Sequence, residues 1–366
     1  MKRRAFIKLA GATLAGAALS QPLGALAAGE RPPEDRIESG FVPLRRGRVI
    51  TSSVTIWDQI ETPRAFVKNL LRDEVILLGE ERDVPGTGSA YNSLWYRTRG
   101  GWVHSAWIQP MDFHDRPAIY RKLGPNGFFW IEVIEPKTAA HKEPSPLSPK
   151  AYDYYYGSVY LVDEVAIDER EVVWYRTYDE YTDREAGIEP THYWAQAHQV
   201  RRVHESEFTA IRPEVADKRI RVDLKAQTAT CYEGDRVVLT TKVATGTRFM
   251  QLDGSVADFG TPVGEHRVVL KQPSRHMRAS EAERNTDGWF DLPGVPWVTF
   301  FTREGIGFHG TYWHNDYGAP RSHGCINVPI PVAKFIYRWT FPTAPYTDSF
   351  VRGDAPGMNS TTVEVV

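Results

Sequence analysis

The sequence predicts a mainly β protein with two or three domains, and three observations support this. The chain has 366 residues, including 29 glycines and 25 prolines, a composition that favours many turns. Its apolar runs are short and rich in β-branched and aromatic residues, with Gly or Pro between them. One run occurs twice, as Leu-Trp-Tyr-Arg-Thr at 94–98 and as Val-Trp-Tyr-Arg-Thr at 173–177, which indicates an internal repeat.

Residues 1–27 have the pattern of an export signal. Basic residues between Lys2 and Lys8 precede an apolar stretch from Leu9 to Leu26, and Ala25-Leu26-Ala27 fits a cleavage site. The order Arg-Arg-x-Phe-Ile-Lys resembles a twin-arginine signal, but a lysine stands where Ser or Thr is usual, so the general secretory route stays open. An N-terminal membrane anchor is the alternative. We expect a protein of the periplasm or cell wall, with no membrane span once the signal is removed.

The charge balance argues against a nucleic-acid-binding protein. Lys and Arg number 44 against 46 Asp and Glu, and no basic stretch follows the signal. The two cysteines, Cys231 and Cys325, are too few for a disulfide scaffold or a cysteine-based metal site. His266, His276 and His314 have no partners at ligand spacing, so we expect no metal and no cofactor.

Two small β domains are expected first, at 35–115 and 116–207. In each, the repeated pentapeptide follows an apolar run, at 73–79 and at 157–163, and precedes a second aromatic segment. Each copy resembles a small bacterial Src-homology-3-like barrel, and the second copy carries an insertion. We expect the repeat tryptophans to be core residues and not glycan-stacking residues: Trp95, Trp102, Trp174 and Trp194.

A polar segment, 201–218, with one short helix, reads as the linker to a C-terminal domain at 218–366. We therefore expect that domain to fold without the two preceding ones. Strands are predicted at 220–224, 228–232, 237–245, 264–272, 297–301, 305–309 and 361–366. Apolar residues at helical spacing predict a short helix from Val332 to Trp339, with Pro331 in its first turn.

The segment Arg-Ser-His-Gly-Cys-Ile-Asn, from Arg321 to Asn327, carries the chemistry. With His309-Gly310 sixteen residues before the cysteine, it offers a thiol and two imidazoles beside glycines, which suits acyl transfer through a thioester. If the segment from 322 to 327 is extended, His323 and Cys325 point to the same side. The glycines would let an acyl group approach the backbone, whose N–H groups could face an oxyanion.

This motif resembles the signature of the bacterial L,D-transpeptidases. The opening hairpin from Ile220, the strand end at Gly246 and the turn Thr261-Pro262-Val263-Gly264 resemble other parts of that domain. The resemblance implies a β-sandwich-like, mainly antiparallel catalytic domain with a short helix after the cysteine loop.

The resemblance also implies roles for the site residues. Cys325 is the nucleophile, and His309 is the proton donor and acceptor, with its tautomer fixed by the Gly310 carbonyl. Local geometry alone favours His323 as the base; in the family's assignment it supports the thiolate region.

Other residues of the motif are expected to position the reacting groups. Ser322 hydrogen-bonds locally, Asn327 braces the loop, and N–H groups around Gly324 and Cys325 form the oxyanion hole. Two residues are expected to bind substrate. Arg321 would meet a carboxylate, unless it is a solvated loop residue, and Tyr312 would line the cleft.

The reaction that the resemblance implies is ping-pong acyl transfer on peptidoglycan stem peptides. Cys325 attacks a stem tetrapeptide, the terminal D-amino acid leaves, and a second stem's amine takes the acyl group in a 3→3 cross-link. With water as the acceptor, the enzyme would be an L,D-carboxypeptidase instead. A third possibility is a wall-binding protein with an idle cysteine domain. A Cys231–Cys325 disulfide would block the nucleophile and is not favoured.

Overall fold

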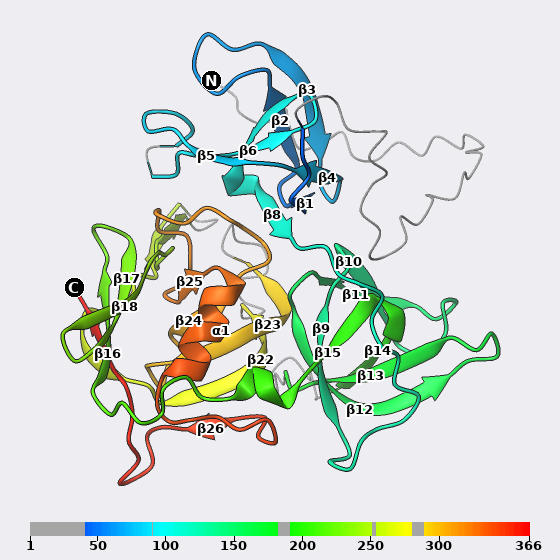
Figure 1. Ribbon diagram of the computed structural model, residues 1–366. Helices are drawn as coiled ribbons and strands as arrows, with labels where there is room; N and C mark the ends of the chain where they lie inside the picture. Colours follow the sequence, from blue (N-terminus) through cyan, green and yellow to red (C-terminus); the bar gives the residue numbers. More distant parts are fainter. Residues whose placement is uncertain (1–40, 90, 182–190, 251–253, 280–288) are drawn as a thin grey trace.

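The computed structural model describes residues 41–89, 91–181, 191–250, 254–279 and 289–366, so the expected export signal lies outside it. This part of the chain is mainly β with one α-helix, which confirms the predicted fold class. Figure 1 shows a first unit in blue and cyan, a second in teal and green, and a C-terminal domain from yellow-green to red. No helix in the described ranges is long and apolar enough to cross a membrane.

The first unit consists of two antiparallel sheets. One has the strand order β4-β1-β8 and the other β3-β2-β7-β6-β5. Its strands are β1 (Arg45–Val49), β2 (Ser53–Trp57), β3 (Phe66–Leu71), β4 (Val75–Leu78), β5 (Glu81–Asp83), β6 (Leu94–Thr98), β7 (Gly101–His104) and β8 (Ile108–Met111).

The second unit is one seven-stranded antiparallel sheet with the order β11-β10-β14-β13-β12-β9-β15. Its strands are β9 (Phe129–Val133), β10 (Lys137–His141), β11 (Lys150–Tyr155), β12 (Val159–Ile167), β13 (Val173–Asp179), β14 (Thr191–Gln196) and β15 (Val200–Val203).

The internal repeat has a structural counterpart. In the first unit β6 and β7 lead through a 3₁₀ turn, η2 (Ser105–Trp107), into β8; in the second, β13 and β14 lead through η3 (Ala197–Gln199) into β15. The repeat tryptophans are core residues, as predicted, with exposures of 1, 7, 0 and 9% for Trp95, Trp102, Trp174 and Trp194. The assignment to Src-homology-3-like barrels stays a prediction.

The C-terminal domain has two five-stranded sheets and the helix α1 (Ile330–Trp339). The first sheet has the order β18-β17-β16-β27-β21, with β16 (Lys218–Asp223), β17 (Thr228–Glu233), β18 (Arg236–Lys242), β21 (Gly264–Arg267) and β27 (Thr362–Val365). The second has the order β25-β24-β23-β22-β26, with β22 (Leu270–Arg278), β23 (Asp291–Phe300), β24 (Gly307–Gly310), β25 (Ile326–Val328) and β26 (Val351–Arg352). A separate hairpin joins β19 (Arg248–Met250) to β20 (Val256–Asp258).

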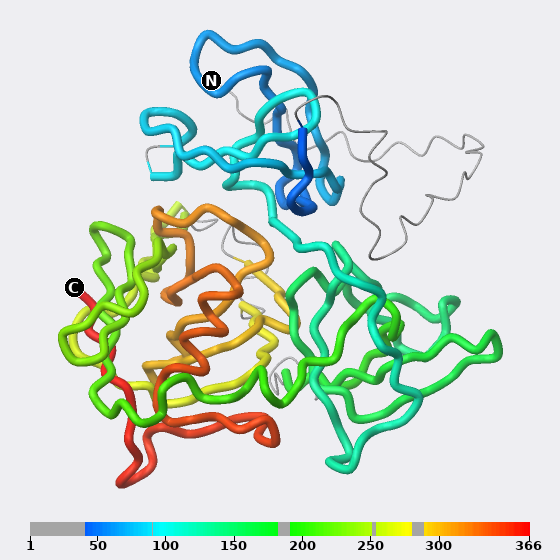
Figure 2. Tube along the Cα trace, viewed as in Figure 1, coloured from blue at the N-terminus to red at the C-terminus, as the bar shows by residue number. Residues whose placement is uncertain are grey.

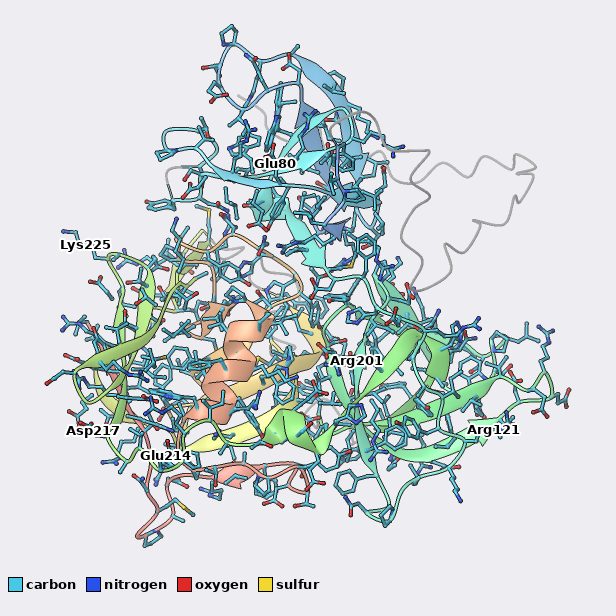
Figure 3. The ribbon with its side chains drawn as sticks, in the orientation of Figure 1. Glu80, Arg121, Arg201, Glu214, Asp217 and Lys225 are labelled. Carbon is cyan, nitrogen blue, oxygen red and sulfur yellow. The ribbon has the colours of Figure 1, made fainter. Side chains whose placement is uncertain are left out.

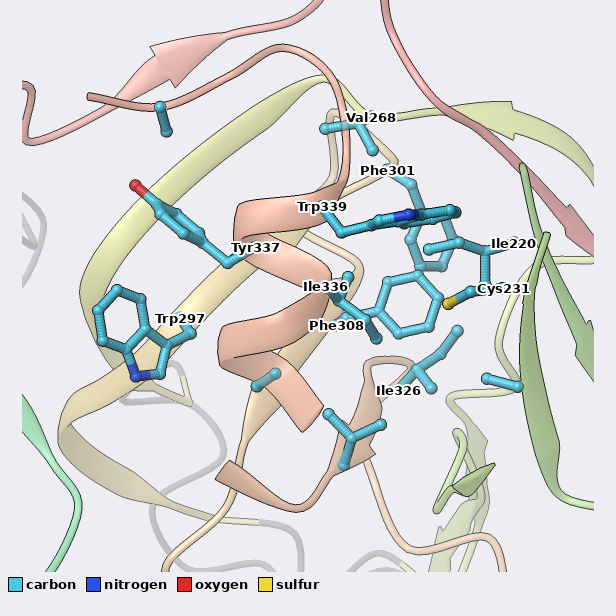
Figure 4. Packing of buried hydrophobic residues seen from close by; sticks show 14 of the residues in the cluster. Ile220, Cys231, Val268, Trp297, Phe301, Phe308, Ile326, Ile336, Tyr337 and Trp339 are labelled. Atoms are coloured by element: carbon cyan, nitrogen blue, oxygen red, sulfur yellow. The ribbon is translucent and has the colours of Figure 1, made fainter. Parts of the chain in front are cut away.

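One core unites both sheets with α1, as Figure 4 shows. Ile220 and Cys231 enter it from the first sheet, and Phe308 and Ile326 enter it from the second. The helix contributes the face predicted from its apolar spacing, including Ile336, and Pro331 lies in its first turn as expected.

Two strand predictions for this domain were wrong. The predicted strand 264–272 is two strands, because the chain crosses between sheets: Val268 N–H binds Thr361 O, whereas Val269 N–H binds Phe300 O. The strand predicted at 297–301 begins earlier, at Asp291. Pro293 and Gly294 lie where the pairing of β23 with β22 is interrupted, between the Val295–Arg275 and Leu292–Met277 pairs.

The segment 201–218 is not a free linker. Phe208, at the end of the 3₁₀ turn η4 (Glu205–Phe208), packs against Trp297 and Tyr346 at ring distances of 5.3 and 5.1 Å. Figure 2 shows this part of the chain, in green, along the base of the C-terminal domain. Trp130 of the second unit joins the same core and donates from Nε1 to Tyr346 O at 3.0 Å.

Charged groups reinforce this boundary. Arg201, labelled in Figure 3, pairs with Glu132 of β9 and with Glu207 of η4. Glu207 also accepts a hydrogen bond from Lys334 of α1. These partly buried ion pairs hold the pKa of Glu207 at about 2, although burial alone would raise it. The second unit and the C-terminal domain therefore share a core and an ion-pair network.

Candidate active site

The register of β24 and β25 brings the predicted catalytic residues together. These strands pair in parallel, with His309 opposite Asn327 and Phe308 opposite Ile326. Side chains alternate along a strand, so Phe308 and Ile326 face the core while His309 and Asn327 share the other face. Cys325 immediately precedes β25 and lies two residues before Asn327, so strand alternation would put it on the side of His309.

His309 is held as a neutral base. Its Nδ1 lies 3.1 Å from Gly310 O, and because a carbonyl only accepts, Nδ1 carries the proton. Burial lowers the pKa of the ring to about 4, and the bond to Gly310 offsets only part of that effect. Nε2 therefore has a free lone pair at neutral pH. The predicted contact with Gly310 is present.

Cys325 rests as a protonated thiol. Burial raises its pKa to about 11, while a backbone hydrogen bond from Gly307 acts in the opposite direction. Sγ donates to Gly305 O at 3.5 Å. Cys231 is also a free thiol, but it is 1% exposed in the core of the domain. The structure thus has no Cys231–Cys325 disulfide.

The chain bends before the cysteine, so the extended conformation considered for 322–327 is wrong. Gly324 has a φ of 109°, and a Cβ on it would lie 2.5 Å from Ile306 Cδ1. His323 is carried away by this bend into an aromatic cluster. Its ring stacks on the ring of Phe249, with 4.2 Å between the ring centres, and its centre lies 4.9 Å from the centre of the Phe290 ring. The same-side argument for His323 as the base therefore fails.

Gly246 and Thr261, two residues of the wider resemblance, brace this bend. Gly246 N–H donates to Thr261 Oγ1 at 2.9 Å, and Thr261 Oγ1 donates to Gly324 O at 2.7 Å. A Cβ on Gly246 would lie 2.0 Å from Phe259 O, so only glycine fits there.

Ser322 hydrogen-bonds locally, as expected. Its Oγ donates to Cys325 O and accepts from Gly324 N–H at 3.1 Å. Gly324 N–H thus already has a partner, and the oxyanion role of the N–H groups around Gly324 and Cys325 stays a prediction.

Asn327 braces the loop between His309 and the cysteine. Its side-chain amide lies 2.8 Å from His314 Nε2, measured at Nδ2, and burial keeps the pKa of His314 at about 3, so the ring stays neutral. Its backbone also pairs with Ala244 in both directions, at 2.9 and 3.0 Å. Sequence reasoning missed His314, because nothing in the spacing of a lone histidine shows this partner.

The two predicted substrate-binding residues have other partners. Tyr312 is 2% exposed and donates its hydroxyl to Pro293 O at 2.8 Å, and its expected contact with substrate stays a prediction. Arg321 pairs with Asp316, and its guanidinium lies 4.8 Å from the Trp107 ring centre. This placement does not support a carboxylate-binding role for Arg321.

The first unit forms hydrogen bonds with the loop 311–321, which the sequence did not predict. Asn315 N–H binds Ala106 O at 3.1 Å, and its side chain donates to Tyr96 OH at 3.1 Å. Asp316 accepts from Asn92 Nδ2 at 3.2 Å. In Figure 1 this loop, drawn in orange, lies directly below the first unit.

Comparison with known proteins identifies the C-terminal region. Residues 217–356 match the model of the YkuD family, described as the L,D-transpeptidase catalytic domain. A Bacillus licheniformis protein named L,D-transpeptidase YkuD is 31% identical over 116 residues, which are 32% of this chain and 56% of that protein. The chain thus spans about half the length of this curated relative.

Solved structures of L,D-transpeptidases are also similar. The Enterococcus faecium catalytic domain acylated by ertapenem is 24% identical, with a TM-score of 0.28, and 41% of this chain and 97% of that one are covered. An L,D-transpeptidase from Mycobacterium smegmatis is 16% identical, with a TM-score of 0.30 and coverage of 56% and 98%. Residues 217–356 thus match the model of an L,D-transpeptidase catalytic domain. The match begins at residue 217 and leaves both N-terminal units outside it.

Proposed function

We propose that this chain is an exported peptidoglycan L,D-transpeptidase that forms 3→3 cross-links through a Cys325 thioester. The observation that carries the proposal is the pairing of β24 with β25, which sets Cys325 and His309 on one face. The hydrogen bond from His309 to Gly310 O supports it, because it leaves Nε2 free to accept a proton. The match of residues 217–356 to the family model supports the reaction class.

In the first half-reaction, Cys325 Sγ attacks the carbonyl carbon of an L-centre in a stem tetrapeptide. His309 Nε2 takes the thiol proton as the S–C bond forms, since a thiol with a pKa of about 11 supplies little thiolate unaided. The carbonyl oxygen becomes an oxyanion near Cys325 N–H. The imidazolium then protonates the leaving nitrogen, the C–N bond breaks, and a D-amino acid departs from the thioester.

The second half-reaction transfers the acyl group. A side-chain amine of another stem attacks the thioester carbonyl and gives its proton to His309. The C–S bond breaks, and the proton returns to Sγ, which restores the resting thiol. No cofactor takes part in either half. This chemistry requires stem peptides, so the protein would act in the periplasm or cell wall, as the pattern of residues 1–27 predicts.

Incubation with purified muropeptides, followed by mass spectrometry of protein and products, tests the proposal. We expect a thioester on Cys325 and cross-linked dimers that lack one D-amino acid. Clipped monomers without dimers would instead identify an L,D-carboxypeptidase. An unmodified protein with unchanged muropeptides would identify an idle domain, and failure to acylate with a carbapenem would confirm that outcome.

A further inference from the structure

A cavity of about 430 Å³ opens beside Cys325 in the C-terminal domain. Its wall includes Gly305, whose carbonyl oxygen accepts from Cys325 Sγ at 3.5 Å. Its lining also includes Leu270, Gln272, Arg275, Phe300 and Arg352.

The sheet register shows that this cavity continues the row of the nucleophile. Arg352 pairs with Leu270, Leu270 with Phe300, and Phe300 with Gly307. Phe308 of β24 pairs with Ile326 of β25. Gly307 comes one residue before Phe308, and Cys325 comes one residue before Ile326, so Gly307 and Cys325 lie in the next row. Directly paired residues share a face, so a substrate chain leaving Cys325 across the sheet would enter the cavity.

Gln272 presents an unused hydrogen-bonding group in the cavity wall. The side chain is 8% exposed, and its Oε1 is buried without a partner among the described residues. Buried amides nearly always have partners, and an unsatisfied one is costly. Rotation of this amide toward the cavity would let a peptide N–H satisfy it.

Arg275 gives the cavity a cation with spare capacity. Its side chain is 39% exposed, and its carboxylate partner among the described residues, Glu180, lies 3.8 Å away. Glu180 already accepts from His276 N–H at 3.0 Å. The other two cationic residues, Arg303 and Arg352, share one carboxylate, Asp354, at 3.2 and 3.0 Å.

We propose that this cavity is the subsite for a carboxylate-bearing segment of the donor stem peptide. Arg275 binds the carboxylate, Gln272 accepts from a peptide N–H, and Leu270 and Phe300 pack against the alkyl part of the segment. The proposal rests on the proposed function for its choice of ligand. Arg321 pairs with Asp316, so Arg275 takes over the binding of the substrate carboxylate that was expected of Arg321.

Direct binding tests the subsite without turnover. The probe is a synthetic stem tetrapeptide, used with all its carboxylates free or with each one amidated in turn, and titrated by calorimetry into the Cys325→Ala protein. We expect one amidation to weaken binding about tenfold, the effect of losing one charge-assisted hydrogen bond. Adding Arg275→Met should lower the affinity for the free peptide about tenfold and leave the affinity for that amidated peptide unchanged.

A matched control separates the local contact from the change in net charge. Arg121→Met removes one exposed arginine of the second unit, paired with Glu171 and labelled in Figure 3, and should leave both affinities within twofold. Gln272→Met should lower the affinity for every peptide by the same factor, because Gln272 would bind a backbone N–H that all the peptides share.

Two outcomes would contradict the proposed subsite. In the first, Arg275→Met lowers the affinities for free and amidated peptides equally. In the second, Arg275→Met leaves both affinities within twofold, as Arg121→Met does. Thioester formation in the unmodified protein distinguishes this failure from that of the proposed function. Acylation with no Arg275 effect would reject the subsite alone. Arg275-dependent binding without acylation would reject the function alone.

Discussion

Arg48 donates a hydrogen bond from Nη2 to the backbone carbonyl oxygen of Tyr312 at 2.8 Å, across 264 residues of sequence. Arg48 is 3% exposed and also pairs with Asp73 at 2.9 Å and with Gln109 Oε1. Tyr312 follows β24, the strand of His309, and its ring stacks on that of Tyr155 in the second unit, with 5.6 Å between the ring centres. Both N-terminal units therefore contact the segment that begins with His309.

The first prediction concerns this contact. Arg48→Met should lower the free energy of unfolding by about 2–3 kcal/mol, because it leaves the buried Tyr312 carbonyl and Gln109 without their donor. Denaturant titration measures this loss, and carbapenem acylation should slow as the loop loosens. Arg45→Met is the control. Its pair with Glu81 is about one-third exposed, so its loss should cost under ~1 kcal/mol. Equal losses in both variants would contradict a role for the Arg48 contact.

The second prediction concerns the nucleophile. Cys325→Ala should abolish acylation by muropeptides and by a carbapenem while the protein stays folded, as checked by mass spectrometry and circular dichroism. Cys231→Ala should keep acylation, because Cys231 lies in the core with its pKa raised to about 12 by burial. A covalent adduct that persisted in Cys325→Ala would refute the assignment.

The third prediction concerns pH. His309 is neutral above about pH 4, so wild-type acylation should fall only as the pH drops through that value and the base is protonated. In His309→Ala, acylation should be ~10²–10⁴-fold slower at neutral pH, the usual effect of a lost general base. It should then rise about tenfold per pH unit, because the thiolate of Cys325 forms only near pH 11. A variant profile with the same shape as the wild type would transfer the base role to another group.

The sequence predicted two contacts of this site that the structure contains. The bond of His309 to the Gly310 carbonyl was expected from the family resemblance, and Ser322 was expected to bond locally. His323 was misplaced, because the bend depends on the φ of Gly324 and on Ile306, Gly246 and Phe259, which pack against it. The contacts of Arg321 with Trp107 and of Tyr312 with Tyr155 were not predicted, because these partners come from segments far away in sequence.

The fold shows the same division. Local patterns predicted the helix, the repeat and most strands. The crossing between sheets at Val268 and the docking of Phe208 were not predicted, because both depend on contacts with distant strands. A segment with polar residues around one buried aromatic has the composition of a linker.

The fourth prediction concerns His276, which bridges Asp179 of the second unit and Asp291 of β23, at 2.7 and 2.6 Å. Burial lowers its pKa, but the two carboxylates outweigh burial and raise it to about 9. A raised folded pKa stabilises the charged form, so this contribution is complete below the unfolded pKa of about 6.5 and is lost as pH rises through about 9. The difference corresponds to ~3 kcal/mol.

Urea titrations from pH 6 to 9.5 measure this contribution. We expect the free energy of unfolding to fall over that interval in the wild type and to change much less in His276→Gln. Parallel curves for the two proteins would contradict the charged bridge. His266→Gln is a matched control, since His266 binds only the carbonyl oxygen of Pro262 among the described residues.

The last prediction separates the two N-terminal units by deletion. Removing residues 28–115 deletes Arg48, Asn92 and Tyr96 but leaves the shared core intact, so the remaining chain should fold and acylate more slowly. Removing residues 28–207 also takes Trp130 out of that core and leaves Phe208 without one of its aromatic neighbours. Truncation of a buried Trp or Phe costs about 3–5 kcal/mol, so such losses approach the ~5–15 kcal/mol that stabilise a whole protein. We expect the longer deletion to lose its cooperative thermal transition and its carbapenem acylation. A sharp transition with normal acylation in that protein would show that the C-terminal domain folds alone, as its polar leading segment first indicated.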